Sequence, residues 1–258
     1  MKTAYTQLRQ HLLLLLAVLV LAGCSTAPRI QGDNEQVVEP SFSAGRLLDD
    51  DVSYLADEIW DPWEGFNRSM YRFNYRFDKY VFLPVANGYQ AITPDFVEQG
   101  FHNFFQNFGE LSTLMNSILQ LHPTKTVETT GRFLINTTVG LLGLFDVASS
   151  LDIPRHNEDF GQTLGHWGVG NGPFLVLPVM GPSNVRDGIG LGVDMYVNQE
   201  IREEGLGMKS EEVTVWNVLD AIDTRANVAF RYFETGSPFE YEWIRLLYTT
   251  KRRMDIER

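Results

Sequence analysis

Residues 61–80, with the sequence DPWEGFNRSMYRFNYRFDKY, decide the fold of this chain. Apolar side chains recur in this stretch at intervals of three and four residues, which is the period of an amphipathic α-helix. Asp61 and Pro62 precede Glu64 in an order typical of a capped helix N-terminus. We therefore predict a helix that begins here and has one apolar face. The apolar positions are Trp63, Phe66, Met70, Phe73, Phe77 and Tyr80.

The same helical period continues toward the C-terminus. Thr93 and Pro94 open a second predicted helix, whose apolar stripe keeps its register for about six turns. A third predicted helix begins near Pro123, and another covers residues 215–233. The sequence SPFE at residues 237–240 repeats the first capping pattern and opens a C-terminal helix. Sustained period-2 alternation is absent, so no sheet is predicted.

The segment between Gly161 and Gly192 differs in composition from the rest of the chain. It holds nine glycines and three prolines around the apolar residues 174–180. Such a stretch suits irregular backbone that is buried against protein or lines a cavity. The predicted fold class is therefore all-α, a single bundle of amphipathic helices with one Gly/Pro-rich irregular segment.

The N-terminus resembles a lipoprotein signal peptide. Two basic residues precede an unbroken apolar run over residues 12–22, which is too short to span a bilayer. The run ends in Leu-Ala-Gly-Cys at residues 21–24, which is similar to the site where lipoprotein signal peptides are cleaved and the cysteine is acylated. An ordinary secretory signal with a chance cysteine is the alternative. We expect residues 1–23 to be removed and Cys24 to carry diacylglyceryl and N-acyl groups.

Residues 24–56 are polar and acidic, and they predict a flexible tether for a folded domain over residues 57–258. From Cys24 onward the chain has 19 basic and 33 acidic residues, a net charge of −14. This charge argues against nucleic acid as a partner. Ser25 stands where an aspartate would indicate retention in the inner membrane, so the outer membrane is the expected location.

Motifs for enzymatic chemistry are missing from the sequence. It contains no nucleophile elbow, zinc-binding HExxH, phosphate-loop lysine or CxxC. We therefore expect no catalytic residue, no metal site and no cofactor. A lipid-cleaving enzyme would need a nucleophile that the sequence does not display.

Aromatic residues are crowded on the first two predicted helices. Those at helical spacing ordinarily face a soluble core. Extra aromatics outside the stripe instead suit helices that lie in a lipid interface, and the expected anchor at Cys24 favours that alternative. The predicted membrane-contact residues are Trp63, Tyr71, Tyr75 and Phe105.

Several long blocks resemble the MlaA family of outer-membrane lipoproteins, also called VacJ. They are DPWEGFNRSMYRFNYRFDKYVFLPVANGY from residue 61, NFFQN from residue 103, RFLINTTVGLLGLFDVA from residue 132, EDFGQTLGHWGVGNGPFLVLPVMGPSNVRDGIG from residue 158 and DTRA from residue 223. The resemblance covers about residues 60–250. It implies a ring-shaped helical protein embedded in the inner leaflet of the outer membrane. Such proteins remove mislocalised phospholipid from the outer leaflet, work with trimeric porins and deliver the lipid to a soluble periplasmic carrier.

Polar residues of the first helix and of the Gly/Pro-rich segment are the candidates for a channel or gate. Arginine suits transient contact with a lipid phosphate. The alternative is that the arginines are solvated or paired with Asp78 and Glu64. A rival function is a periplasm-facing adaptor lipoprotein with a soluble helical core. The candidate channel and gate residues are Asn67, Arg72, Asn74, Arg76, Asn171, Arg186 and Asp187.

Overall fold

The computed structural model describes residues 59–234 and 236–257. The predicted signal peptide, Cys24 and the tether to residue 56 lie outside these residues, so those assignments stay predictions. The all-helical fold class is confirmed, because helices make up most of the described chain. In this part of the chain, every helix is too short or too polar to cross a membrane.

The first helical stretch runs through three consecutive elements, α3 (Glu64–Phe77), the π-helix η2 (Asp78–Phe82) and α4 (Leu83–Ile92). Pro84 explains the interruption, because it has no N–H to donate to the preceding turn and its ring crowds that turn. The predicted side-chain cap is not formed. The helix begins at Glu64, and Asp61 instead accepts a hydrogen bond from the Asn67 side chain at 2.8 Å.

The second and third predicted helices are α5 (Asp95–Leu119) and α6 (Pro123–Thr138). Pro123 occupies the first turn of α6, where its missing N–H would have no helical partner. The two helices pack against each other along their length, and the short α7 (Val147–Ser150) packs on α6.

The Gly/Pro-rich segment is more ordered than its composition indicates. Helix α8 (Phe160–His166) is followed by an antiparallel hairpin of β1 (Phe174–Leu177) and β2 (Gly181–Asn184), which leads directly into α9 (Val185–Glu200). The expected irregular backbone is therefore confined to short connections, and the structure adds a small sheet that the sequence did not predict.

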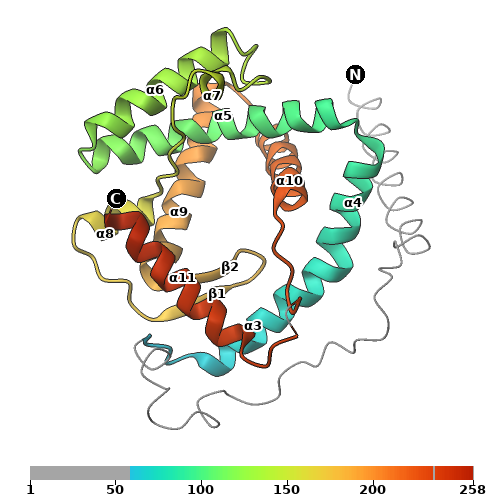
Figure 1. Cartoon of the computed structure of the whole chain (residues 1–258), viewed down its shortest axis with the longest axis vertical. Coiled ribbons are helices and arrows are strands. Elements are labelled where there is room, and N and C mark those ends of the chain that lie inside the picture. Colours follow the sequence, from blue (N-terminus) through green and yellow to red (C-terminus); the bar gives the residue numbers. More distant parts are fainter. Residues whose placement is uncertain (1–58, 235, 258) are drawn as a thin grey trace.

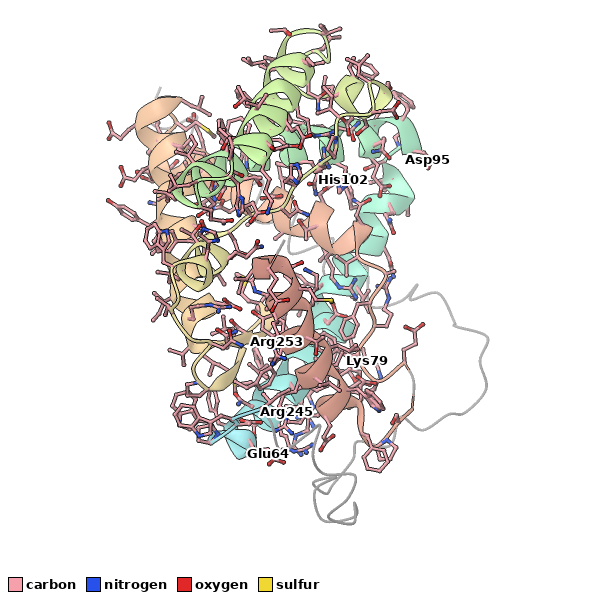
Figure 2. All side chains as sticks on the ribbon, turned by 60° about the vertical axis from the view of Figure 1, so that its left-hand side comes forward. Glu64, Lys79, Asp95, His102, Arg245 and Arg253 are labelled. Carbon is pink, nitrogen blue, oxygen red and sulfur yellow. The ribbon has the colours of Figure 1, made fainter. Side chains whose placement is uncertain are left out.

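The remaining elements are the π-helix η3 (Ile201–Gly205), α10 (Ser210–Asn227) and α11 (Glu240–Glu257). Helix α10 packs on α4 and α5, while α11 packs on α8 and β2. Together the elements follow a closed outline, with α3, α4, α5 and α9 around it and the hairpin within (Figure 1). Viewed from another side, His102 of α5 lies far from Glu64 of α3 (Figure 2).

The described residues bury polar side chains more often than apolar ones. Eight apolar residues are buried, against 24 polar or charged residues, and 36 large apolar residues are exposed. A water-soluble domain has the opposite distribution, because apolar burial is its main source of stability. The small apolar core consists of Tyr71, Phe174, Val176, Phe233 and Tyr241.

Candidate functional site

Helix α3 buries polar positions and exposes most of its apolar stripe. Its buried positions, including Asn67 and Asn74, are polar or bear a hydroxyl and recur at helical spacing. The predicted apolar stripe faces outward, with Phe66 51% exposed and Tyr80 70% exposed. The helix prediction is confirmed. Of the two alternatives for its apolar stripe, the soluble core is wrong, because the stripe is exposed, and membrane contact stays a prediction.

Asn67 holds the β-hairpin through its backbone. The side-chain amide donates to the Phe174 carbonyl at 3.0 Å, and its oxygen accepts from the Val176 N–H at 2.8 Å. Both bonds are buried, and Asn67 itself is 0% exposed. This pair of bonds closes one edge of β1 as a neighbouring strand would.

Asn74 repeats this arrangement at the end of β1 and just beyond it. It donates to the Leu177 carbonyl at 2.9 Å and accepts from the Val179 N–H at 2.7 Å. Val179 has a φ of 67°, which is strained for a β-branched residue. The bond from its N–H to Asn74 stabilises this turn conformation, so Asn67 and Asn74 together fix the position and shape of the hairpin.

The start of α3 and the start of α11 are joined by a latch, which consists of Asp61, Tyr71, Glu240, Tyr241 and Arg245. The Tyr241 hydroxyl donates to Asp61 at 2.5 Å, and the Arg245 guanidinium donates to the same carboxylate at 3.2 Å. The Tyr71 hydroxyl donates to Glu240 at 2.5 Å. These contacts connect residues about 170 to 180 positions apart and close the outline of helices.

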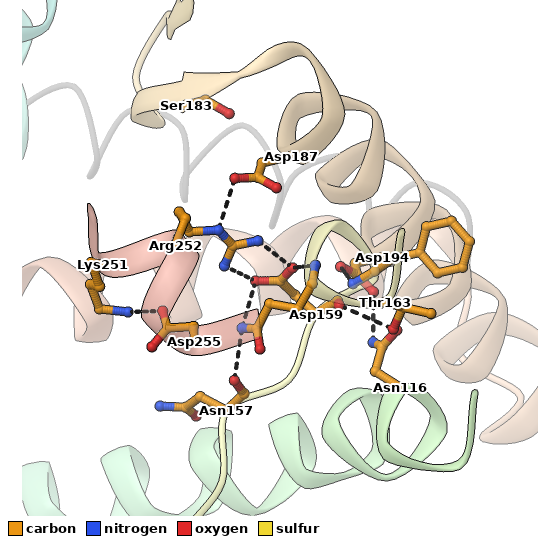
Figure 3. A network of polar contacts seen from close by, with 12 residues as sticks. Asn116, Asn157, Asp159, Thr163, Ser183, Asp187, Asp194, Lys251, Arg252 and Asp255 are labelled. Atoms are coloured by element: carbon orange, nitrogen blue, oxygen red, sulfur yellow. Dashed lines mark hydrogen bonds and ion pairs between the residues drawn. The ribbon is translucent and has the colours of Figure 1, made fainter. Parts of the chain in front are cut away.

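An ionic cluster joins α8, α9 and α11, in which Arg252 and Asp187 are buried and Asp159 is partly exposed (Figure 3). Arg252 donates two hydrogen bonds to Asp159, at 2.6 and 2.8 Å, and a third to Asp187 at 2.8 Å. Burial alone would raise the pKa values of the Asp159 and Asp187 carboxyl groups. The hydrogen bonds from Arg252 outweigh burial and lower both pKa values below the ordinary value. Both acids therefore stay charged, and the cluster is held by charge-assisted hydrogen bonds.

A cavity lies beside this cluster. Arg186, which is 4% exposed, donates to Asp187 at 2.9 Å and to the Asn171 side chain at 2.6 Å. Arg186 and Asn171 line a cavity of about 280 Å³ together with Arg253 and Glu257 near the end of α11. The site is thus an open hollow with two arginines in a largely apolar lining, next to the glycine-rich connection between α8 and β1.

A second buried cluster joins α5, α6 and α7. Its centre is Arg132, which is 0% exposed and donates to Glu110 at 3.0 Å. The same guanidinium donates to both carboxylate oxygens of Asp146 at 2.9 Å and to the Ile153 carbonyl at 2.6 Å. A single arginine therefore connects two helices and the chain around α7.

The pKa of Asp146 makes this cluster sensitive to acid. Burial would raise the pKa, but hydrogen bonds from Ser149 and Asn136 and the charge of Arg132 lower it to about 2. A lowered pKa stabilises the fold above the unfolded value of about 3.9, and this stabilisation is lost as the pH falls toward 2. We expect Asp146→Asn to remove part of the loss of stability between pH 4 and pH 2, as measured by denaturant unfolding at each pH. An unchanged pH dependence would contradict the assignment.

The structure separates the predicted channel residues into three places. Asn171, Arg186 and Asp187 form one cluster at the cavity. Asn67 and Asn74 are buried at the hairpin, so they present almost no surface to a channel. Arg72, which is half-buried, and Arg76, which is exposed, lie together on a different side of α3 from Asn67 and Asn74. Their role as gate residues stays a prediction.

The predicted membrane-contact aromatics also differ in exposure. Trp63 is 46% exposed. Tyr71 is corrected to a core residue, because it is 2% exposed and packs edge-on against Phe233. Tyr75 is half-buried and packs against the aromatic ring of Phe233, and Phe105 is half-buried beside Trp216.

Apart from Asp187, the residues of the two ionic clusters were not predicted as site residues, although a signal for them exists. Polar residues on the long helices recur at helical spacing, as in Thr129, Arg132 and Asn136 of α6, and these are the buried positions. A polar stripe at helical spacing thus marks the protein interior in this chain. Among the described residues, no group of three or more His, Cys, Asp or Glu side chains is placed to hold a metal ion.

Comparisons with known proteins cover most of the described chain. An uncharacterised protein of Rickettsia prowazekii is 45% identical over 130 residues, which are 50% of this chain and 52% of that protein. The Escherichia coli K12 protein named "Intermembrane phospholipid transport system lipoprotein MlaA" is 39% identical over 131 residues, 49% of this chain and 52% of its own. The chain therefore spans about half the length of these curated relatives. The protein of the same name from Haemophilus influenzae is 32% identical over 183 residues, 70% of this chain and 64% of its own.

A solved structure described as "Structural basis for maintenance of bacterial outer membrane lipid asymmetry" has the same fold. It superposes with a TM-score of 0.60 at 30% identity, over 76% of this chain and 98% of its own. The profile of the MlaA lipoprotein family matches residues 59–255. This chain belongs to the MlaA lipoprotein family.

Proposed function

We propose that this protein removes mislocalised phospholipid from the outer leaflet of the outer membrane and so maintains lipid asymmetry. The observation that carries the proposal is the inverted distribution of side chains, with polar residues inside and apolar residues outside. An exposed apolar surface of this extent suits hydrocarbon rather than water. The names of the E. coli and H. influenzae relatives, as lipoproteins of an intermembrane phospholipid transport system, support the same role.

In this proposal the ring lies within the periplasmic leaflet, with Cys24 acylated. Its outer apolar side chains contact lipid tails, while a polar interior takes the headgroup. Dragging an unpaired polar headgroup through the bilayer core costs several kcal/mol, and a polar passage avoids this penalty. Asn171 and Arg186, which line the cavity, are the residues we assign to headgroup contact. The role requires no covalent chemistry and no cofactor.

The proposed partners follow from the direction of transport. A phospholipid leaving the outer membrane needs a carrier to cross the aqueous periplasm, because its acyl chains are insoluble there. We assign that role to a soluble periplasmic lipid carrier, and we propose a trimeric porin as the neighbour within the membrane. Both assignments extend the family resemblance to this chain.

The deciding experiment measures phospholipid in the outer leaflet. Deleting the gene is expected to raise the outer-leaflet phospholipid that a membrane-impermeant phospholipase can reach, and the wild-type gene is expected to restore the low level. Arg186→Gln is expected to restore it incompletely. Gly192→Ala, on α9 where an added methyl group meets nothing within 4 Å, is the matched control and should complement fully. Unchanged outer-leaflet phospholipid after deletion would overturn the proposal.

Solubility distinguishes this role from the rival adaptor. A full-length Cys24→Ser variant lacks the lipid anchor but keeps the exposed apolar surface. We expect it to aggregate or to retain bound lipid when detergent is removed, because 36 large apolar side chains are exposed in the described residues. Light scattering and lipid analysis of the purified variant provide the measurement. A monodisperse, lipid-free protein would support an adaptor with a soluble core instead.

A further inference from the structure

The exposed side of α3 divides into two flanks. At 100° per residue, Phe66, Phe73 and Phe77 lie within about 40° of one another on one flank. Arg72 and Arg76 lie about 100° away from them on the other, and the buried face that holds the hairpin occupies the remaining side. Helix α3 therefore presents an apolar flank and a cationic flank side by side.

Lys79 extends the cationic flank into η2. Its ammonium lies 3.1 Å from the Tyr75 hydroxyl and over the rings of Tyr75 and Tyr80, with its nitrogen 5.4 and 5.6 Å from their centroids. The hydrogen bond with Tyr75 raises the pKa of Lys79. Both side chains of the cation–aromatic pair Lys79 and Tyr80 are exposed. This is the arrangement of a lysine whose stem lies on aromatic surface while its charge reaches outward.

Arg72 has no ion pair or hydrogen bond with another residue in the described ranges 59–234 and 236–257. Arg68, one helical turn before Arg72, is paired in contrast, because it binds Glu64 at 2.7 Å and also Glu242. An arginine without such a partner, next to the exposed Lys79, stands out on a chain whose net charge is −12. The flank is thus complementary to an anionic ligand, although the protein as a whole is not.

We propose that Arg72 and Lys79 bind the phosphates of anionic phospholipids in the leaflet around the ring, while the adjacent apolar flank lies in the acyl region. The inference rests on the proposed function for the membrane that it names. Aromatic rings beside cations are typical of helices that lie at the level of the headgroups. The ligand is a bilayer lipid at the outer edge of the ring, distinct from the transported lipid assigned to the cavity.

The test measures lipid binding to the acylated full-length protein in detergent micelles. Short-chain phosphatidylglycerol is titrated in, and binding is followed by calorimetry. One cation near an anionic lipid surface contributes about 1 kcal/mol, which is about a fivefold change in affinity. The double variant Arg72→Gln/Lys79→Gln is therefore expected to bind phosphatidylglycerol about 25-fold more weakly. Lys251→Gln, which removes an exposed lysine on α11, is the matched control and should bind as the wild type does.

Three results would overturn the proposal. The first is equal affinity of the double variant and the wild type, and the second is equal affinity of the wild type for phosphatidylcholine. The third is competition by inorganic phosphate at the concentration of the lipid, which would indicate a plain anion site. The deletion experiment on outer-leaflet phospholipid does not depend on these cations, so it tests the proposed function separately.

Discussion

Replacing Arg132 with methionine is expected to lower the free energy of unfolding by about 3 to 5 kcal/mol. Methionine fills most of the volume but removes every hydrogen bond to Glu110, Asp146 and the Ile153 carbonyl. Glu110 is 2% exposed, and burial already raises its pKa. Without the charge of Arg132, this carboxylate loses its shortest ion pair, and Arg155 at 3.3 Å is left to compensate.

Denaturant unfolding in mild detergent, followed by circular dichroism, provides the measurement for Arg132→Met. The matched control is Arg253→Met, since Arg253 is exposed on α11. Surface substitutions of this kind change stability by less than about 0.5 kcal/mol. If both variants unfold at the same denaturant concentration, the Arg132 cluster does not hold α5, α6 and α7 together in the way the contacts indicate.

The second large effect is expected at Gly190, where α9 crosses α8. A Cβ atom on Gly190 would lie 2.3 Å from the backbone nitrogen and 2.6 Å from the Cα of Gly161. Neither atom belongs to a flexible side chain, so Gly190→Ala must push the two helices apart. We expect a loss of about 3 kcal/mol or more, because overpacking against backbone leaves no rotamer to relieve it.

Gly192→Ala is the control on the same helix. A methyl group added at Gly192 would have no other atom within 4 Å, and alanine is the better helix former by about 1 kcal/mol. This variant should therefore be as stable as the wild type or more so. Equal destabilisation by the two substitutions would show that loss of glycine flexibility, and not the close contact between α8 and α9, is responsible.

The separation of α8 and α9 should also weaken the ionic cluster around Arg252. Asp159 lies at the start of α8 and Asp187 in the first turn of α9, and Arg252 binds both. We therefore expect Gly190→Ala to increase proteolysis of α11 as well as to lower global stability. Gly192→Ala should leave the protease sensitivity unchanged.

The positions of the helices could be predicted from the sequence, but the faces that they bury could not. The period of apolar residues in α3 locates the helix because side chains four residues apart share a face. The same period does not reveal whether that face meets a core or a lipid. In α3 the polar positions Asn67 and Asn74 are buried, so the usual rule that apolar stripes face inward does not hold there, and the sequence alone left both orientations open.

The hairpin and the ionic clusters could not be predicted from the sequence, for different reasons. Strand β1 has four residues, FLVL, which are too few and too uniformly apolar to show alternation. The clusters join residues far apart in sequence, such as Asp159 and Arg252, and no local pattern connects them. Asn171, Arg186 and Asp187 were named from one glycine-rich segment and lie together in the structure, but their role in a channel stays a prediction.

The latch between Asp61 and Tyr241 has a consequence for how the protein folds. Its two ends are 180 positions apart, so bringing them together restricts nearly the whole described chain. The entropy of closing a loop grows with its length, and non-local contacts of this kind form late. Helices α3 to α10 are therefore expected to assemble first, with docking of α11 as the last step. A nascent chain that lacks α11 would therefore expose an open arc of helices until the last residues are made.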